Sequence, residues 1–265
     1  MLTPDQIAVI EADLARSRAR TRLLDLDGMP VIVKQLEAQL KHWGYPVLDA
    51  LASLLRQPML RAVPAPGGRA AQQIEVARLR TLAAAGVPVP EVLHATPQWL
   101  ALSWVGELTL DQLLRRHPDI GQRYWESGLE AILALHRLGQ TASQCFARNM
   151  LWHEGKISFI DFEDDPTQTM PLSSAQARDW MLYLHSTAYI VKMDPQRIAD
   201  IMLRHLRKDD DEVRRQVISA AKTFGWLRIL PDQRKPWGRD VVAVQAAARV
   251  MHLLVAQVRR MRVDL

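Results

Sequence analysis

Short apolar runs and turn residues alternate in the first third of the chain and predict a small antiparallel sheet. Residues 20–26 and 30–36 read as two strands on either side of Asp27-Gly28, a pair that accepts positive φ and favours a tight hairpin. Further on, the apolar run Trp99–Val105 predicts another strand, which ends at Gly106. These strands form one unit near the N-terminus.

Helical periodicity appears between the strands and dominates after them. Apolar positions at helical spacing predict a short helix over 5–14, a mostly helical segment over 38–62 and a longer helix over 71–84 that ends before Gly86. From Leu110 onward the pattern is almost entirely helical, with one interruption at 150–162 that reads as a second hairpin. The order of elements predicts an α+β fold.

The composition is typical of a globular chain and limits its possible partners and cellular location. Of the 265 residues, 48% are hydrophobic and 24% charged, enough for one domain or two closely packed lobes. The net charge of +5 favours anionic partners such as nucleotide, phospholipid or nucleic acid. The single cysteine, Cys145, excludes a disulfide framework and a cysteine-only metal cluster. Residues 1–12 lack the order of a secretory signal, and no uncharged apolar stretch of about 18 residues occurs, so we expect a cytoplasmic protein with no spanning helix.

Four polar residues carry candidate chemistry because of their order along the predicted elements. Lys34 ends a strand, Glu75 lies on the main helix, Asn149 precedes the second hairpin and Asp161 follows it. A lone strand lysine is usually a surface charge, and a lone helical glutamate is usually solvated. A carboxylate at the end of a buried strand, in contrast, has to be paired or metal-bound to offset its desolvation. The combination therefore predicts a site that none of the four would predict alone.

These residues and their surroundings resemble the protein-kinase-like superfamily from about residue 20 to about residue 188. The nearest resemblance is to bacterial lipopolysaccharide-kinase-like and Rio-like atypical kinases. It implies a two-lobed fold, in which residues 1–105 form an N-lobe with a small antiparallel sheet, one main helix and an inserted helical segment. Residues 106–265 would form a larger helical C-lobe with the catalytic loop and the metal-binding region.

The resemblance also implies a role for each candidate residue, with ATP and Mg²⁺ as cofactors. Lys34 would hold the nucleotide phosphates and Glu75 would be its ion-pair partner. Ser103 and Trp104 lie where the strand runs into the hinge, whose backbone groups receive the adenine. Asn149 and Asp161, the latter in Asp161-Phe162-Glu163, would bind the metal through oxygen. Asp179 would brace the catalytic loop.

Two departures from the family pattern put catalysis in question. Ala142-Ser143-Gln144 stands where the family has His-Gly-Asp, and Gln144 cannot take up a proton as the usual aspartate base does. As a hypothesis, Gln144 orients an acceptor hydroxyl instead. The phosphate-covering segment 15–24 contains no glycine; alternating arginines at 16, 18, 20 and 22 would share one face of an extended strand, either to grip phosphates or as a solvated basic face.

Two functions follow from these observations. The first is an atypical ATP-dependent kinase that acts on a small-molecule, lipid-linked sugar or protein hydroxyl, with the acceptor not identified. The alternative is a nucleotide-binding pseudokinase with a regulatory or scaffolding role. Arginines 259, 260 and 262 end the last apolar helix and favour either a peripheral contact with an anionic inner-membrane surface or simply a helix C-terminus. A nucleic-acid partner is the least supported reading.

Overall fold

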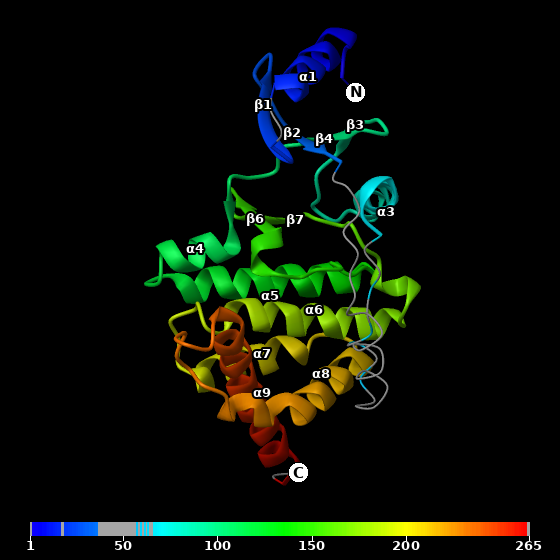
Figure 1. Ribbon diagram of the computed structural model, residues 1–265. Coiled ribbons are helices and arrows are strands. Elements are labelled where there is room, and N and C mark those ends of the chain that lie inside the picture. The colour runs from blue at the N-terminus through cyan, green and yellow to red at the C-terminus, as the bar shows by residue number, and fades with distance from the viewer. Residues whose placement is uncertain are drawn as a thin grey trace.

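The computed structural model describes residues 2–16, 19–36, 57, 59, 61, 63 and 66–263. At one end, a four-stranded antiparallel sheet of order β1-β2-β4-β3 makes up the N-terminal lobe together with two helices (Figure 1). Their bounds are α1 (Pro4–Arg16), β1 (Thr21–Leu26), β2 (Met29–Gln35), α3 (Gly68–Ala84), β3 (Val92–Ala95) and β4 (Trp99–Ser103). Most of the predicted helical segment 38–62 lies outside the described residues.

The first hairpin forms at the predicted turn. Leu26 pairs with Met29, and the two residues between them, Asp27 and Gly28, have φ values of 58° and 82°. Such a two-residue turn needs positive φ at both central positions, which aspartate and glycine adopt at low cost. It fixes the register of β1 against β2 and thereby the face on which each β2 side chain lies.

Alternation along the strands divides the sheet into two faces. Val31 and Val33 of β2 pack with Ala101 of β4 and with Ile10 of α1 in one small apolar cluster, so α1 covers this face. Residues of opposite parity, Ile32 and Leu102, belong instead to the main core of the protein. Lys34 follows the same alternation and therefore lies on the face that looks toward α3 and the second lobe.

The C-terminal lobe is a stack of helices with a three-stranded sheet, β5-β6-β7, facing the first lobe (Figure 1). Its elements are β5 (Leu108–Thr109), α4 (Leu110–Arg116), α5 (Gly121–Arg137), η2 (Ala147–Asn149), β6 (Met150–His153), β7 (Lys156–Phe159), η3 (Pro166–Gln168), α6 (Leu172–Thr187), α7 (Pro195–Leu206), α8 (Asp211–Phe224), η4 (Gly225–Ile229) and α9 (Arg239–Val263). The second predicted hairpin is β6–β7, with Glu154 and Gly155 in its turn.

The last helix, α9, lies against other helices of this lobe. Residues Arg239–Met261 are long and apolar enough to cross a membrane, with a hydropathy of 1.6, and 39% of that apolar window is buried inside the protein. The sequence predicted no spanning helix because Arg249 interrupts this apolar stretch, but one charge leaves the helix apolar enough in composition to cross a membrane. One such helix is weak evidence for a span, since Val250 and Leu254 are buried in the main core as in a soluble helical lobe.

The chain therefore has the predicted class: α+β, two lobes, a small antiparallel sheet with one main helix, and a larger helical part. Two short strands were missed. β3 has four residues and β5 has two, too short for a periodicity to show, and each forms because a neighbouring strand offers it a free edge. The described end of the predicted insertion does not stay with the N-lobe, because Gln57 donates hydrogen bonds to Ser219 and Thr223 of α8.

Candidate nucleotide and metal site

A buried ion pair joins the sheet to the main helix of the N-lobe. Lys34 Nζ on β2 lies 2.6 Å from Glu75 Oε1 on α3, and these side chains are 18% and 4% exposed. Burial acts to lower the pKa of Lys34, but the neighbouring carboxylates outweigh it and the pKa is raised. The ammonium is therefore charged and held in one position, as a phosphate-binding lysine has to be.

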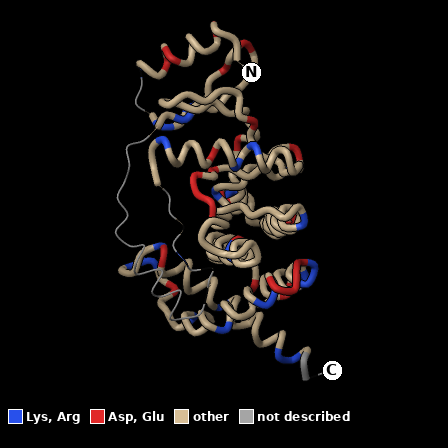
Figure 2. The backbone as a smooth tube through the Cα atoms, turned by 90° about the vertical axis from the view of Figure 1, so that its right-hand side faces the viewer, with Lys and Arg blue, Asp and Glu red and all other residues tan. Residues whose placement is uncertain are grey.

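Two further carboxylates reach the same ammonium from the segment after β7. Asp161 Oδ1 is 3.6 Å and Glu163 Oε1 is 3.8 Å from Lys34 Nζ. The side view shows acidic positions of this segment where the two lobes meet (Figure 2). Asp161 has a φ of 71°, a left-handed conformation that costs a non-glycine residue energy and that collects at functional sites. The residue thus departs from the β7 direction and turns toward the N-lobe.

Asn149 ends the short helix η2 and lies next to the start of the Asp161 segment. Its carbonyl oxygen accepts a hydrogen bond from Ile160 N at 3.0 Å, and its Nδ2 donates to Gln144 O at 3.0 Å. This second bond leaves the amide oxygen as a ligand. Among the described residues no group of three or more His, Cys, Asp or Glu side chains forms a metal cage. Two oxygen ligands fit Mg²⁺ well, because that ion keeps waters and takes its other ligands from nucleotide phosphates.

Segment 141–144, the predicted catalytic loop, is held by a buried aspartate. Asp179 Oδ2, fully buried on α6, accepts hydrogen bonds from Thr141 Oγ1 at 2.7 Å and from Ala142 N at 2.8 Å. His136 faces the same oxygen at 3.4 Å and links it to Asp209. A third contact comes from the N-lobe, where Arg78 Nη2 of α3 donates to Thr141 O at 2.7 Å. Helix α3 is therefore connected both to Lys34 and to segment 141–144.

A carboxylate that the sequence reasoning missed lies beside Gln144. Gln144 Nε2 donates to Asp164 Oδ2 at 2.9 Å, while Asp164 Oδ1 is buried and has no hydrogen-bond partner among the described residues. Burial is the main reason that the pKa of Asp164 is raised to about 6. Ser143, with a φ of 64°, donates through its hydroxyl to the Asp164 carbonyl at 3.1 Å. The acidic run that follows Phe162 was the available signal, but only the fold shows which of its members turns inward.

The predicted hinge residues end the strand that pairs with the lysine strand. Ser103 is opposite Val31, and its N–H and hydroxyl are both engaged with the backbone of Glu91. Trp104 N–H donates to Pro30 O at 3.4 Å. In the described chain the next residue, Val105, has an N–H without such a bond.

The predicted arginine face does not form. Arg16 ends helix α1 instead of lying on a strand, and Arg18 lies outside the described residues. Arg22 turns to Asp13, with Nη1 2.8 Å from Oδ2 and a side chain that is only 8% exposed. Arg20 forms an ion pair with Glu163. The alternation failed as a predictor because α1 continues two residues beyond the predicted end at Leu14, and because acidic partners approach from other elements.

The structure thus brings Lys34, Glu75 and Asp161 together and, beside them, Asn149 with Gln144. Glu163 and Asp164 join the site without having been predicted. Such a cluster can hold polyphosphate through the ammonium and a hard cation through oxygen ligands, with an amide in place of the usual base.

Comparison with known proteins adds no family name. No family model matches the sequence, and no curated protein does. Among solved structures, the streptomycin-ATP-APH(2'')-IIa ternary complex aligns at 11% identity over 96% of this chain and 100% of that chain, with a TM-score of 0.35. A mutant of the Neurospora crassa PAN3 pseudokinase aligns at 11% identity over 99% of this chain and 72% of that chain, with a TM-score of 0.32. Because both TM-scores are low, the assignment of the fold rests on the arrangement of this chain itself.

Proposed function

We propose that the protein is an atypical ATP-dependent kinase that binds Mg²⁺-ATP between its lobes and transfers a phosphoryl group to an acceptor hydroxyl. The ion pair of Lys34 with Glu75, with Asp161 Oδ1 3.6 Å from the same ammonium, carries the proposal. A surface lysine has no need of a carboxylate that is 4% exposed and reaches it from a helix 41 residues further along the chain. A lysine that receives phosphates does need it, because its charge has to be fixed in place before the ligand arrives.

Each residue then has a defined task when nucleotide is bound. Lys34 donates to the phosphates, and Glu75 keeps the ammonium in position. Asn149 and Asp161 would hold Mg²⁺, which neutralises charge on the phosphate oxygens. Glu163 contacts Lys34 and Arg20 when no nucleotide is bound. Phosphates that bind Lys34 therefore have to displace Glu163.

Transfer without the usual aspartate is expected to be slow. General-base assistance is worth roughly 10² to 10⁴ in rate. Phosphoryl transfer passes through a loose transition state, however, and depends mostly on positioning and electrostatics, which remain here. Gln144 Nε2 donates a hydrogen bond to Asp164, and this bond sets the orientation of the amide. The amide oxygen can then accept a hydrogen bond from the hydroxyl that receives the phosphoryl group.

The alternative is a pseudokinase that uses nucleotide as a structural or switching ligand. The observation in its favour is that the loop 142–144 offers no carboxylate of its own, while Asp164 is only 5% exposed. Nucleotide binding alone would then stabilise the folded state, because a ligand that binds only this state raises the apparent stability.

Calorimetric titration with ATP, with and without Mg²⁺, combined with ADP release over hours, tests the proposal. We expect magnesium-dependent binding and slow turnover, both lost in Asp161→Ala and both retained in Asp232→Ala, a matched change at an exposed aspartate. Binding without turnover favours the pseudokinase. Absence of binding in the wild type would remove both functions and leave only the fold.

A further inference from the structure

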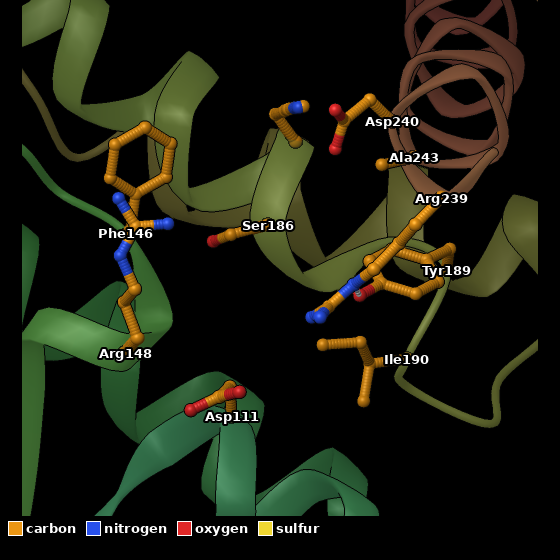
Figure 3. Close-up of a pocket in the computed structure, with 10 residues that line it drawn as sticks. Asp111, Phe146, Arg148, Ser186, Tyr189, Ile190, Arg239, Asp240 and Ala243 are labelled. Carbon is orange, nitrogen blue, oxygen red and sulfur yellow. Dashed lines mark hydrogen bonds between the residues drawn. The ribbon is translucent and has the colours of Figure 1, made fainter.

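A cavity of about 310 Å³ opens in the C-lobe beside the catalytic-loop segment (Figure 3). Its walls come from η2 and the residue before it, from α4, from the end of α6 and from the first turn of α9. Arg148 lies on one side in this view, and Arg239 and Tyr189 lie on the other. The volume is that of a pocket for a small molecule.

The cavity shares a wall with the proposed transfer site. Phe146 and Arg148 line it, and both belong to the segment between Gln144 and Asn149. Arg148 immediately precedes the proposed metal ligand Asn149, so their Cα atoms are about 3.8 Å apart. The opposite wall is fastened to this segment, because Ala147 N donates to Ser186 Oγ of α6 at 3.0 Å. A molecule bound here therefore lies against the segment that carries Gln144 and Asn149.

Two arginines in this cavity are held by aromatic rings instead of by carboxylates. The Arg148 guanidinium lies over the Phe146 ring at 4.2 Å, and the Arg239 guanidinium lies over the Tyr189 ring at 5.6 Å. Arg239 Nε also donates to Tyr189 OH at 2.5 Å. Neither arginine forms an ion pair with a described carboxylate. The remaining N–H donors of each guanidinium are thus held in place without a hydrogen-bond acceptor among the described residues, and they can donate to a phosphate or carboxylate group.

The acids of the cavity do not cancel this preference. Asp111 is engaged, because it accepts from Thr109 Oγ1 at 2.6 Å and lies 3.6 Å from Arg115 Nε. Asp240 is exposed and acts on His185, whose pKa is lowered by burial although Asp240 opposes this. Arg148, Arg239 and Asp240 are all exposed and screened by water, and the two positive charges exceed the single negative charge of Asp240.

We propose that this cavity binds the phosphoryl acceptor and that the acceptor is a small hydroxyl compound carrying a phosphate or carboxylate group. The inference rests on the proposed function and adds the substrate class. Arg148 and Arg239 grip the anionic group, and the hydroxyl extends past Arg148 toward Asn149 and Gln144. A neutral polyol has no anionic group that could accept hydrogen bonds from the two guanidinium groups.

Titrations with small probes test the inference. Glycerol 3-phosphate, glycerate and glycerol are titrated in the presence of saturating Mg²⁺-ADP, and the two anions separate phosphate from carboxylate. We expect at least one anion to bind at least about tenfold more tightly than glycerol, and this binding to fall at least about tenfold in Arg148→Gln and in Arg239→Gln. Arg249→Gln, an exposed arginine on the same helix as Arg239, is the control and should bind as the wild type does. Unchanged melting temperatures show that each variant is folded.

The outcomes separate this inference from the proposed function. Lys34→Met should weaken Mg²⁺-ATP binding about 100-fold and leave anion binding intact when the nucleotide is omitted. Arg239→Gln should weaken anion binding at least about tenfold and leave Mg²⁺-ATP binding intact. Failure of the wild type to bind Mg²⁺-ATP defeats the proposed function while the cavity remains testable with the probes alone. Equal binding of glycerol and both anions, absence of anion binding at 10 mM (about the −3 kcal/mol range), or retained anion binding in both arginine variants overturns the inference.

Discussion

Two buried carboxylates in this protein stand in opposite surroundings. Glu75 is met by the Lys34 ammonium at 2.6 Å, so its charge is compensated inside the N-lobe. Asp164 accepts a side-chain hydrogen bond from the Gln144 amide, and its other oxygen has no hydrogen-bond partner in the described chain. The charge of Arg178 acts to lower its pKa, but burial outweighs this effect. The first arrangement stabilises a charge where phosphates arrive. The second keeps a carboxylate buried beside Gln144. In the proposed function the first arrangement is the nucleotide end of the site and the second is its transfer end.

The largest effect is expected from the brace that both regions share. Asp179→Ala would leave Thr141 Oγ1, Ala142 N and His136 without their common buried acceptor, at a cost of about 3 to 5 kcal/mol in the free energy of unfolding. Asp179→Asn keeps one oxygen and should lose less. Denaturant unfolding measures both, and a loss below 1 kcal/mol in the alanine variant would show that the catalytic loop is not braced in this way.

Lys34→Met isolates the nucleotide end. We expect Mg²⁺-ATP affinity to fall about 100-fold, or about 2.7 kcal/mol, because a charge-assisted contact with phosphate is lost. Burial favours the protonated form of Glu75, and without the lysine its pKa rises further, so the variant loses stability relative to the wild type as the pH rises. Calorimetry and unfolding at several pH values measure these effects. Lys156→Met, at an exposed lysine on β7, should change neither.

Asp164→Asn isolates the transfer end and should raise stability. The folded pKa of about 6 exceeds an unfolded value of about 3.9, so the unfolded chain loses its proton first and wild-type stability falls as the pH rises between them. The variant has no such loss. Its advantage should grow by about 2 kcal/mol between pH 4 and pH 7. A constant difference across this range, or none, would mean that the buried carboxylate carries no charge cost; Asp232→Asn is the exposed control.

Gln144→Ala is expected to give the smallest effect. Turnover of Mg²⁺-ATP should fall about tenfold, because an orienting amide contributes less than a general base. Nucleotide affinity should stay within about twofold, since Gln144 has no contact with Lys34. Unchanged turnover, together with an inactive Asp161→Ala, would rule out the orienting role and leave Asp164 as the only unusual group at this end.

The local sequence pattern was enough to predict most helices and strands and the positions of the four candidate residues on them. The Asp27-Gly28 turn fixed the register that places Lys34 on the inner face, and the helix before Gly86 carries Glu75 as expected. Asn149 and Asp161 flank the β6–β7 hairpin as predicted, and their neighbours are joined by the bond from Ile160 N to Asn149 O. The short strands β3 and β5 could not be predicted from the sequence, because a strand of two to four residues forms only where the edge of a neighbouring strand is available for pairing.

The sequence by itself determined which candidate side chains are present and on which elements they lie, since spacing along strands and helices decides which side chains share a face. Only the tertiary structure decided their partners. Arg22 pairs with Asp13 and Arg20 with Glu163 instead of forming one basic face, and Asp164 alone among the acids after Phe162 meets Gln144. Such pairings join residues up to 143 positions apart, and their energies depend on burial and on distances that no local pattern contains.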